Sequence, residues 1–196
     1  MEMIAMQNEL FNAHPAEIQI WAVRARLPLG RRLRYWLGYV VGLAIRCFTL
    51  RHGGRYSHLL VRLGGTIWEA AGAGVREGRA DEYRDAACVI DVFRPPLDAA
   101  QRERLLAWVR QAVGLPYDWP QLLRIALAEL GRADVASLVP DLGESGLICS
   151  EFVALACLHA GLDLTGGVPL WRWTPDHVTA ACRAGRLDRR GRLAWS

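Results

Sequence analysis

The chain has 196 residues, of which 52% are hydrophobic and 22% charged. This composition excludes an intrinsically disordered chain and is sufficient for one large domain with a buried core. All basic side chains are arginine, and the net charge of +4 is too small to indicate a nucleic-acid-binding protein. We therefore expect a single domain over residues 1–196 without a nucleic-acid partner.

Strand patterns dominate the first half of the chain and helix patterns the second half. In chain order we predict a strand over Glu17–Val23, a helix over Leu29–Leu50, strands over Ser57–Leu63, Thr66–Ala70 and Cys88–Phe93, helices over Asp98–Val113 and Pro120–Leu130, a loop over Gly131–Gly146, and helices over Ile148–Ala160 and Thr174–Ala184. This order indicates an α+β fold rather than a doubly wound parallel sheet.

The most apolar segment, Tyr35–Ile45, lies within the first predicted helix and has arginines on both sides. It is shorter than the roughly 20 residues that a membrane-spanning helix needs. The length favours a core helix, and the alternative is a helix lying on an anionic membrane surface. Residues 1–10 lack the pattern of a signal peptide, so we expect a cytoplasmic protein, with peripheral membrane association as the alternative.

Gly64-Gly65 separate two strand patterns and so predict a β-hairpin. If these glycines form the turn, Glu69 pairs with Leu60. His58 lies on the same face as Leu60 because strand side chains alternate. His58 and Glu69 are then diagonal neighbours on the polar face of the hairpin, whereas the opposite face is nearly all apolar. The pattern predicts a histidine held by a carboxylate, and a surface ion pair is the alternative.

Cys149 begins a predicted apolar helix. A thiol in the first helical turn meets unpaired backbone N–H groups and the positive end of the helix dipole, which both favour the thiolate. The same N–H groups suit an oxyanion. The alternative for Cys149 is a small buried hydrophobic residue. We expect that simpler role for the other cysteines, which form no CxxC pair, so no zinc or thioredoxin-type site is indicated. They are Cys47, Cys88, Cys157 and Cys182, and the odd total of 5 indicates free thiols in a reducing compartment.

A nucleophilic cysteine needs a base, and five histidines compete for that role. His159 is excluded because it lies about 15 Å along the helix from Cys149. His58 alone comes with an orienting carboxylate. Other carboxylates could orient it, but only Glu69 has a position that the register defines. The remaining histidines are His14, His52 and His177, and the other carboxylates are Asp118, Asp141 and Glu151.

These residues occur in chain order within short segments: Tyr-Ser-His58-Leu-Leu-Val, Ile-Trp-Glu69-Ala-Ala-Gly and Cys149-Ser-Glu-Phe. With Gly114-Leu-Pro-Tyr-Asp118 and Thr174-Pro-Asp176, they resemble the permuted papain-like amidases of the YaeF/YiiX group, which are circularly permuted relatives of the NlpC-type cell-wall peptidases. The resemblance runs from about Glu17 to Ser196. It implies an antiparallel sheet packed against helices, with Cys149 at a helix start facing His58 on a strand.

The resemblance also implies a cysteine hydrolase that cleaves an amide or peptide bond through a thioester. Cys149 would be the nucleophile, His58 the base and Glu69 the orienting group, with Tyr117 and Ser150 in the substrate pocket or oxyanion site. The expected substrate is a peptide, an amide or a lipid amide, and no metal or organic cofactor is implied. A lipid acyltransferase or thioesterase of the lecithin–retinol acyltransferase type and a catalytically silent binding module are the alternatives.

Overall fold

In a computed structural model, the described residues are 17–25, 56–84, 88–129, 131–140, 145–165, 173–186 and 188–194. They contain a six-stranded sheet in the order β4-β3-β2-β1-β5-β6, in which all neighbouring strands are antiparallel. The strands are β1 (Ile18–Ala25), β2 (His58–Leu63), β3 (Thr66–Ala71), β4 (Gly74–Arg79), β5 (Cys88–Arg94) and β6 (Asp188–Ala194). The helical elements are η2 (Ala80–Tyr83), α3 (Ala99–Ala112), α4 (Trp119–Glu129), α5 (Ala133–Ala136), α6 (Cys149–His159), α7 (Pro175–Ala181) and the π-helical turn η5 (Cys182–Arg186).

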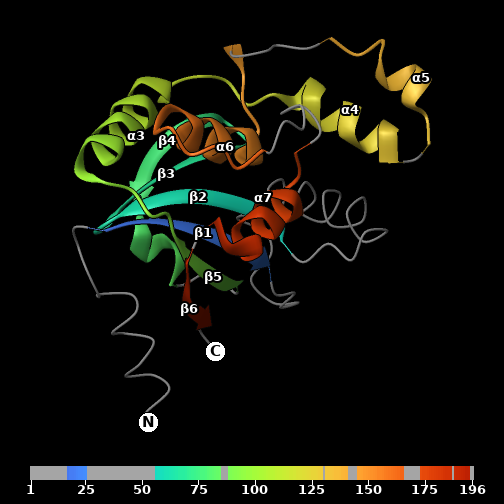
Figure 1. The fold of residues 1–196 in the computed structure, drawn as a ribbon. Coiled ribbons are helices and arrows are strands. Elements are labelled where there is room, and N and C mark those ends of the chain that lie inside the picture. The colour runs from blue at the N-terminus through green and yellow to red at the C-terminus, as the bar shows by residue number, and fades with distance from the viewer. Residues whose placement is uncertain are drawn as a thin grey trace.

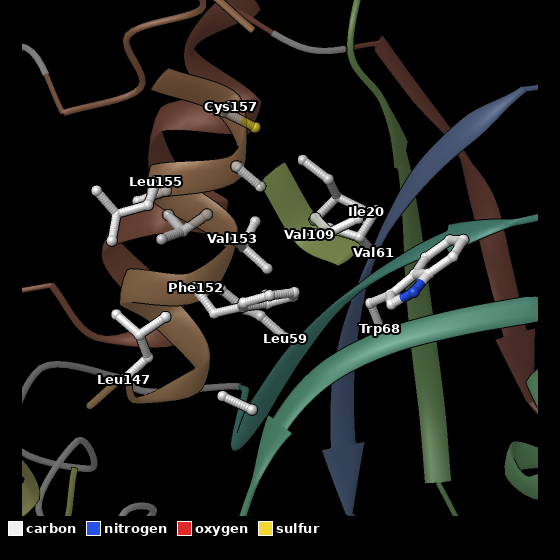
Figure 2. Packing of buried hydrophobic residues seen from close by; sticks show 14 of the residues in the cluster. Ile20, Leu59, Val61, Trp68, Val109, Leu147, Phe152, Val153, Leu155 and Cys157 are labelled. Atoms are coloured by element: carbon white, nitrogen blue, oxygen red, sulfur yellow. The ribbon is translucent and has the colours of Figure 1, made fainter. Parts of the chain in front are cut away.

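Helix α6 lies across β2 and β3 and packs beside α3 on one face of the sheet (Figure 1). Figure 2 shows Phe152 and Val153 of α6 turned toward Leu59, Val61 and Trp68 of the sheet, all within one buried apolar cluster. Complete burial of each such side chain contributes about 1.5–3 kcal/mol. This packing fixes the first turn of α6, where Cys149 lies, against the beginning of β2.

Every residue of α6 from Cys149 to Cys157 is buried. A helix that is apolar on all sides is stable only where other elements surround it. The predicted helix Ile148–Ala160 is therefore confirmed as a central helix, and Gly161 ends it with a φ of 81° that favours glycine.

The opposite face of the sheet is buried as well. Leu60 and Ile67, on the hairpin face predicted to be polar, are fully buried in a second apolar cluster with Trp21 and Ile90. The polar face of the hairpin is thus an interior surface, which corrects the idea of an ion pair exposed at the surface. A hairpin by itself does not reveal what covers its second face.

The sheet has two strands that the sequence pattern did not predict, β4 and β6. Both lie at the edges of the sheet, and neither has the apolar alternation of a strand buried within it. Two further predictions need adjustment: the loop Gly131–Gly146 contains the short helix α5, and the last helix becomes a π-helical turn after Ala181.

The predicted helix Leu29–Leu50, with its apolar segment, lies outside the described residues. Among the residues that the structure describes, no helix is both long enough and apolar enough to cross a membrane.

Candidate active site

The hairpin has the register that the two glycines predict. Val61 pairs with Trp68 and Leu63 with Thr66, which sets the turn at Gly64-Gly65. In this register, His58 Nε2 lies 2.6 Å from Glu69 Oε2. The sequence-based pairing of His58 with Glu69 on one face of the hairpin is therefore confirmed.

The Glu69 carboxylate is 1% exposed and is held by three side chains. Besides its bond to His58, it accepts a hydrogen bond of 2.5 Å from the Tyr83 hydroxyl and another from the Arg76 guanidinium. Burial raises the pKa of Glu69, but the hydrogen bond and charge of His58, together with Tyr83 and Arg76, lower it to about 2. Glu69 is therefore a carboxylate throughout the neutral range.

Tyr83 and Arg76 are site residues that the sequence analysis missed. Arg76 on β4 is the direct cross-strand partner of Glu69, and Ala71 pairs with Gly74 across a second two-residue turn. The glycines around this turn, with opposite charges placed symmetrically about it, are the signal that could have revealed Arg76. Tyr83 is on η2, whose approach to Glu69 depends on tertiary folding.

Cys149 is the first residue of α6 and is 3% exposed. Its side chain lies close enough to His58 to affect the charge of the imidazole ring. Burial lowers the pKa of His58, but the hydrogen bonds to Cys149 and Glu69 and their negative charges raise it, to about 10. The imidazole ring therefore carries a proton at neutral pH between a carboxylate and a sulfur atom.

Two of the other candidate carboxylates, Asp118 and Glu151, hold the beginnings of helices. Asp118 Oδ1 accepts the backbone N–H of Gln121 at the start of α4, and Glu151 accepts the backbone N–H of Ile148, the residue before α6. Each satisfies a helix terminus instead of orienting His58. Asp141 lies outside the described residues.

The other histidines in the described residues also have contacts of their own. His159 stacks on Trp108 with ring centroids 5.2 Å apart, and Nδ1 of His177 lies 2.9 Å from the Thr174 hydroxyl at the start of α7. His14 and His52 lie outside the described residues.

The described cysteines, Cys149 included, are all buried. Cys88, Cys157 and Cys182 are buried free thiols. Burial raises the pKa of the Cys182 thiol to about 12 and that of Cys157 still further. Cys47 lies outside the described residues. Among the described cysteines, Cys149 is the one at a helix start beside a histidine.

Tyr117 reaches the site through an extended segment anchored on both sides. On one side, the backbone N–H of Val75 donates to the Leu115 carbonyl at 2.8 Å. On the other, Tyr117 forms a parallel bridge with Leu147, two residues before Cys149. Gly74 permits the approach to Leu115, because a Cβ there would lie 2.4 Å from that carbonyl oxygen. Burial, and then the neighbouring Cys149, Glu151 and Asp118, raise the pKa of Tyr117, so its phenol stays neutral and can donate.

Ser150 is fully buried, and its hydroxyl donates to the Trp173 carbonyl at 2.6 Å. The side chain therefore ties α6 to the segment before α7. Ser150 belongs to the wall of the site, as predicted, but its hydroxyl is already engaged there.

A small pocket of about 20 Å³, partly open to solvent, lies beside Cys149. It is formed by the start of α6, by α4 and by the segment that leads into α7. Most of its lining is apolar. The lining residues are Tyr117, Leu122, Ile125, Ala126, Ile148, Cys149, Ser150, Trp173, Thr174 and Pro175.

Comparison of the chain with protein-family models, with curated proteins and with solved structures finds no match. In the described part of the chain, no group of three or more His, Cys, Asp or Glu side chains could hold a metal ion.

Proposed function

We propose that this chain is a cysteine hydrolase that cleaves an amide or peptide bond through a thioester on Cys149, and that its α+β architecture is a permuted papain-like fold. The observation that carries the proposal is the His58 side chain, which is hydrogen-bonded to the buried Glu69 and lies close to Cys149, the first residue of a buried helix. Covalent catalysis of acyl transfer requires this arrangement, in which a nucleophile lies beside a base and an orienting group holds the base.

In the first step, the Cys149 thiolate attacks the substrate carbonyl carbon. A C–S bond forms, and the electron pair of the carbonyl moves to its oxygen. When the tetrahedral intermediate collapses, the C–N bond breaks and the His58 imidazolium gives its proton to the leaving nitrogen. The acyl group stays on Cys149 as a thioester, and the amine departs.

In the second step, water attacks the thioester and His58, now neutral, takes a proton from it. The C–S bond breaks, the carboxylic acid leaves, and the proton on His58 restores the ion pair with the Cys149 thiolate. One water is consumed for each amide bond cleaved, so no cofactor is needed to balance the reaction.

The negative charge on the carbonyl oxygen needs donors that are in place before the reaction. The N–H groups in the first turn of α6 supply the positive end of the helix dipole. The neutral Tyr117 phenol, in the wall of the same pocket, is the side-chain donor that we assign to this oxygen.

Glu69 keeps the imidazole ring oriented and stabilises its charged form. Because Tyr83 and Arg76 hold the carboxylate, the ring position is set by buried groups. Because the His58 ring is already in position, it does not have to move when charge develops at the reacting carbonyl.

The first test needs no substrate. A limiting amount of iodoacetamide at pH 7, followed by intact mass spectrometry and peptide mapping, is expected to label Cys149 first, because thiolate fraction and access set the alkylation rate. Equal labelling of all five cysteines in the folded protein would contradict the proposal.

The second test is turnover of a panel of chromogenic amides and esters. Cys149→Ala is expected to abolish it, while Cys88→Ala, which also removes a buried thiol, is the matched control and is expected to keep it. Equal activity of Cys149→Ala and Cys88→Ala would exclude a thioester on Cys149.

A further inference from the structure

Three arginines from three different elements lie around the side chains of Tyr56 and Asp91. Arg192 on β6 donates from Nε and Nη2 to the two Asp91 oxygens, at 2.6 and 3.0 Å. Nη2 of Arg183, on η5, lies 4.0 Å from Asp91 Oδ2 and donates to the Tyr56 hydroxyl. Arg24 on β1 has its guanidinium carbon 5.6 Å from the centre of the Tyr56 ring. We call Arg24, Arg183 and Arg192 the arginine cluster.

The arginine cluster carries more positive charge than the side chains around it neutralise. Each guanidinium stays protonated at every accessible pH. Among the described residues, Asp91 is the one acidic side chain that pairs with the cluster, and Nε of Arg24 is buried without a hydrogen-bond partner. One arginine is enough to balance Asp91, so that role does not account for the other two.

Two members of the cluster share one aromatic ring. The guanidinium carbons of Arg183 and Arg24 lie 5.3 and 5.6 Å from the centre of the Tyr56 ring, which is buried. The face of the ring attracts each cation, but it adds no negative charge to offset the repulsion between them. A bound anion would offset that repulsion.

Arg183 and Arg192 can be reached from solution, because their side chains are 41% and 45% exposed. Asp91 takes two of the five N–H donors of Arg192, so others remain for a further acceptor. The Nη2 atoms of the two arginines are at most 7.0 Å apart, since they lie 4.0 and 3.0 Å from the same atom, Asp91 Oδ2. Two oxygens of one phosphate group can bridge this span with hydrogen bonds of about 2.8 Å.

A phosphate monoester matches the cluster in charge and in geometry. It carries a charge of about −1.5 to −2 at neutral pH and has three acceptor oxygens, which arginine binds in pairs. A carboxylate has less charge and only two oxygens. Asp91 does not compete with such a ligand, because it is 1% exposed and already accepts hydrogen bonds from Tyr56 and Arg192.

From these observations we propose that the arginine cluster is a binding site for a phosphate group carried by a ligand. The site contains none of the three proposed catalytic residues. Its occupancy can therefore be measured whether or not the chain is a hydrolase.

The experiment is calorimetric titration of the full chain with inorganic phosphate, phenyl phosphate and acetate at constant ionic strength. Both phosphates are expected to bind saturably, and acetate roughly tenfold more weakly or less, because it makes fewer charged hydrogen bonds. Arg183→Gln is expected to weaken phosphate binding by roughly tenfold or more. Arg132→Gln makes the same change in net charge at an exposed arginine beside Asp134, and this matched control is expected to bind as the wild type does.

A measurement on the wild type keeps the test decisive if Arg183→Gln does not fold. Phenylglyoxal modifies exposed arginines, and peptide mapping gives the rate at each one. Phosphate is expected to slow modification of Arg183 and Arg192 and to leave Arg132 unchanged. Equal rates with and without phosphate at Arg183 and Arg192, or acetate that binds as tightly as phosphate, would overturn the proposal.

Two sources of the phosphate group are separated by comparing phenyl phosphate with vesicles of phosphatidylcholine that contain phosphatidic acid. If phenyl phosphate displaces the protein from these vesicles, and Arg183→Gln weakens both interactions, the site accepts a phosphate group from a soluble ester or a lipid headgroup, and the tighter of the two identifies the source. Attachment to the vesicles without any binding of free phosphate would overturn the site. Cys149→Ala is expected to bind phosphate as the wild type does, so this result is independent of the hydrolase.

Discussion

Two buried carboxylates on the sheet, one on β3 and one on β5, are held in similar ways but differ in what they can do. Each is 1% exposed, and each accepts hydrogen bonds from a tyrosine hydroxyl and an arginine guanidinium. They are Glu69, held by Tyr83 and Arg76, and Asp91, held by Tyr56 and by two nitrogens of Arg192 at 2.6 and 3.0 Å.

The difference lies in one further partner. Asp91 has a second arginine, Arg183, at 4.0 Å, whereas Glu69 has His58 at 2.6 Å. An arginine stays protonated at every accessible pH, so the group around Asp91 neutralises a buried charge and ties β5 to β6. A histidine can gain and lose its proton. The similar set of hydrogen bonds around Glu69 can therefore direct proton transfer at a neighbouring thiol.

The largest expected effect is a loss of activity when Glu69 is replaced. Glu69→Gln is expected to lower kcat by roughly 10³–10⁴, because the imidazole loses the charge that orients and stabilises its protonated form. Steady-state kinetics on the best substrate of the panel measure this. A loss of less than about tenfold would show that Glu69 does not orient His58.

The second effect concerns the proton on His58. His58→Ala is expected to slow alkylation of Cys149 at pH 6.5 by roughly tenfold or more, because an unpaired thiol with a pKa of about 8.5 is almost wholly protonated there. Rates of iodoacetamide labelling between pH 5.5 and about 9 measure it. Profiles that coincide for the wild type and His58→Ala would mean that His58 does not hold the thiolate.

The third effect is on stability against acid. The pKa of Glu69 is about 2 in the folded chain against 4.5 normally, so its stabilisation is complete above about pH 4.5 and is lost as the pH falls through 2. The pKa of His58 is raised from 6.5 to about 10, so its stabilisation is complete below 6.5 and is lost as the pH rises through 10.

Thermal melts of the wild type and Glu69→Gln between pH 2 and 7 measure the acid limb. The wild type is expected to lose its advantage over Glu69→Gln as the pH falls. A constant difference in Tm over that range would show that Glu69 is not a stabilising carboxylate.

Replacing the other buried carboxylate, by Asp91→Asn, is expected to affect stability and not the reactivity of Cys149. It is expected to cost about 1–3 kcal/mol of unfolding free energy, because its hydrogen bonds from Tyr56 and Arg192 lose their charge. Urea unfolding measures the loss. Alkylation of Cys149 in the folded fraction is expected to match the wild type, and a slower rate would place Asp91 among the groups that act on the site.

The smallest expected effect tests one of the hydrogen bonds that hold the Glu69 carboxylate. Tyr83→Phe removes one hydrogen bond to Glu69 without removing the ring, which packs edge-on against Trp21 with centroids 6.2 Å apart. We expect kcat to fall by about fivefold, equivalent to about 1 kcal/mol, with KM unchanged. A change in KM alone would assign Tyr83 to substrate binding instead of positioning.

Local rules in the sequence were sufficient to predict several parts of the site. The turn at Gly64-Gly65 and the alternation along two strands fixed which side chains share a face, and so brought His58 to Glu69. Likewise, the apolar run after Ile148 placed Cys149 in the first turn of a helix, and Asp98 caps α3 as its position predicts. Each of these depends only on residues close together in the chain.

The tertiary structure decided the rest, because those features depend on elements far apart in the sequence. Packing of α6 on β2 brings Cys149 to His58, and the approach of η2 brings Tyr83 to Glu69. The edge strands β4 and β6 were missed because a strand paired on one side can carry polar residues on both faces. The pocket beside Cys149 depends most on tertiary folding, since its wall combines residues of α4, α6 and the segment before α7, whose shared surface exists only once they pack together.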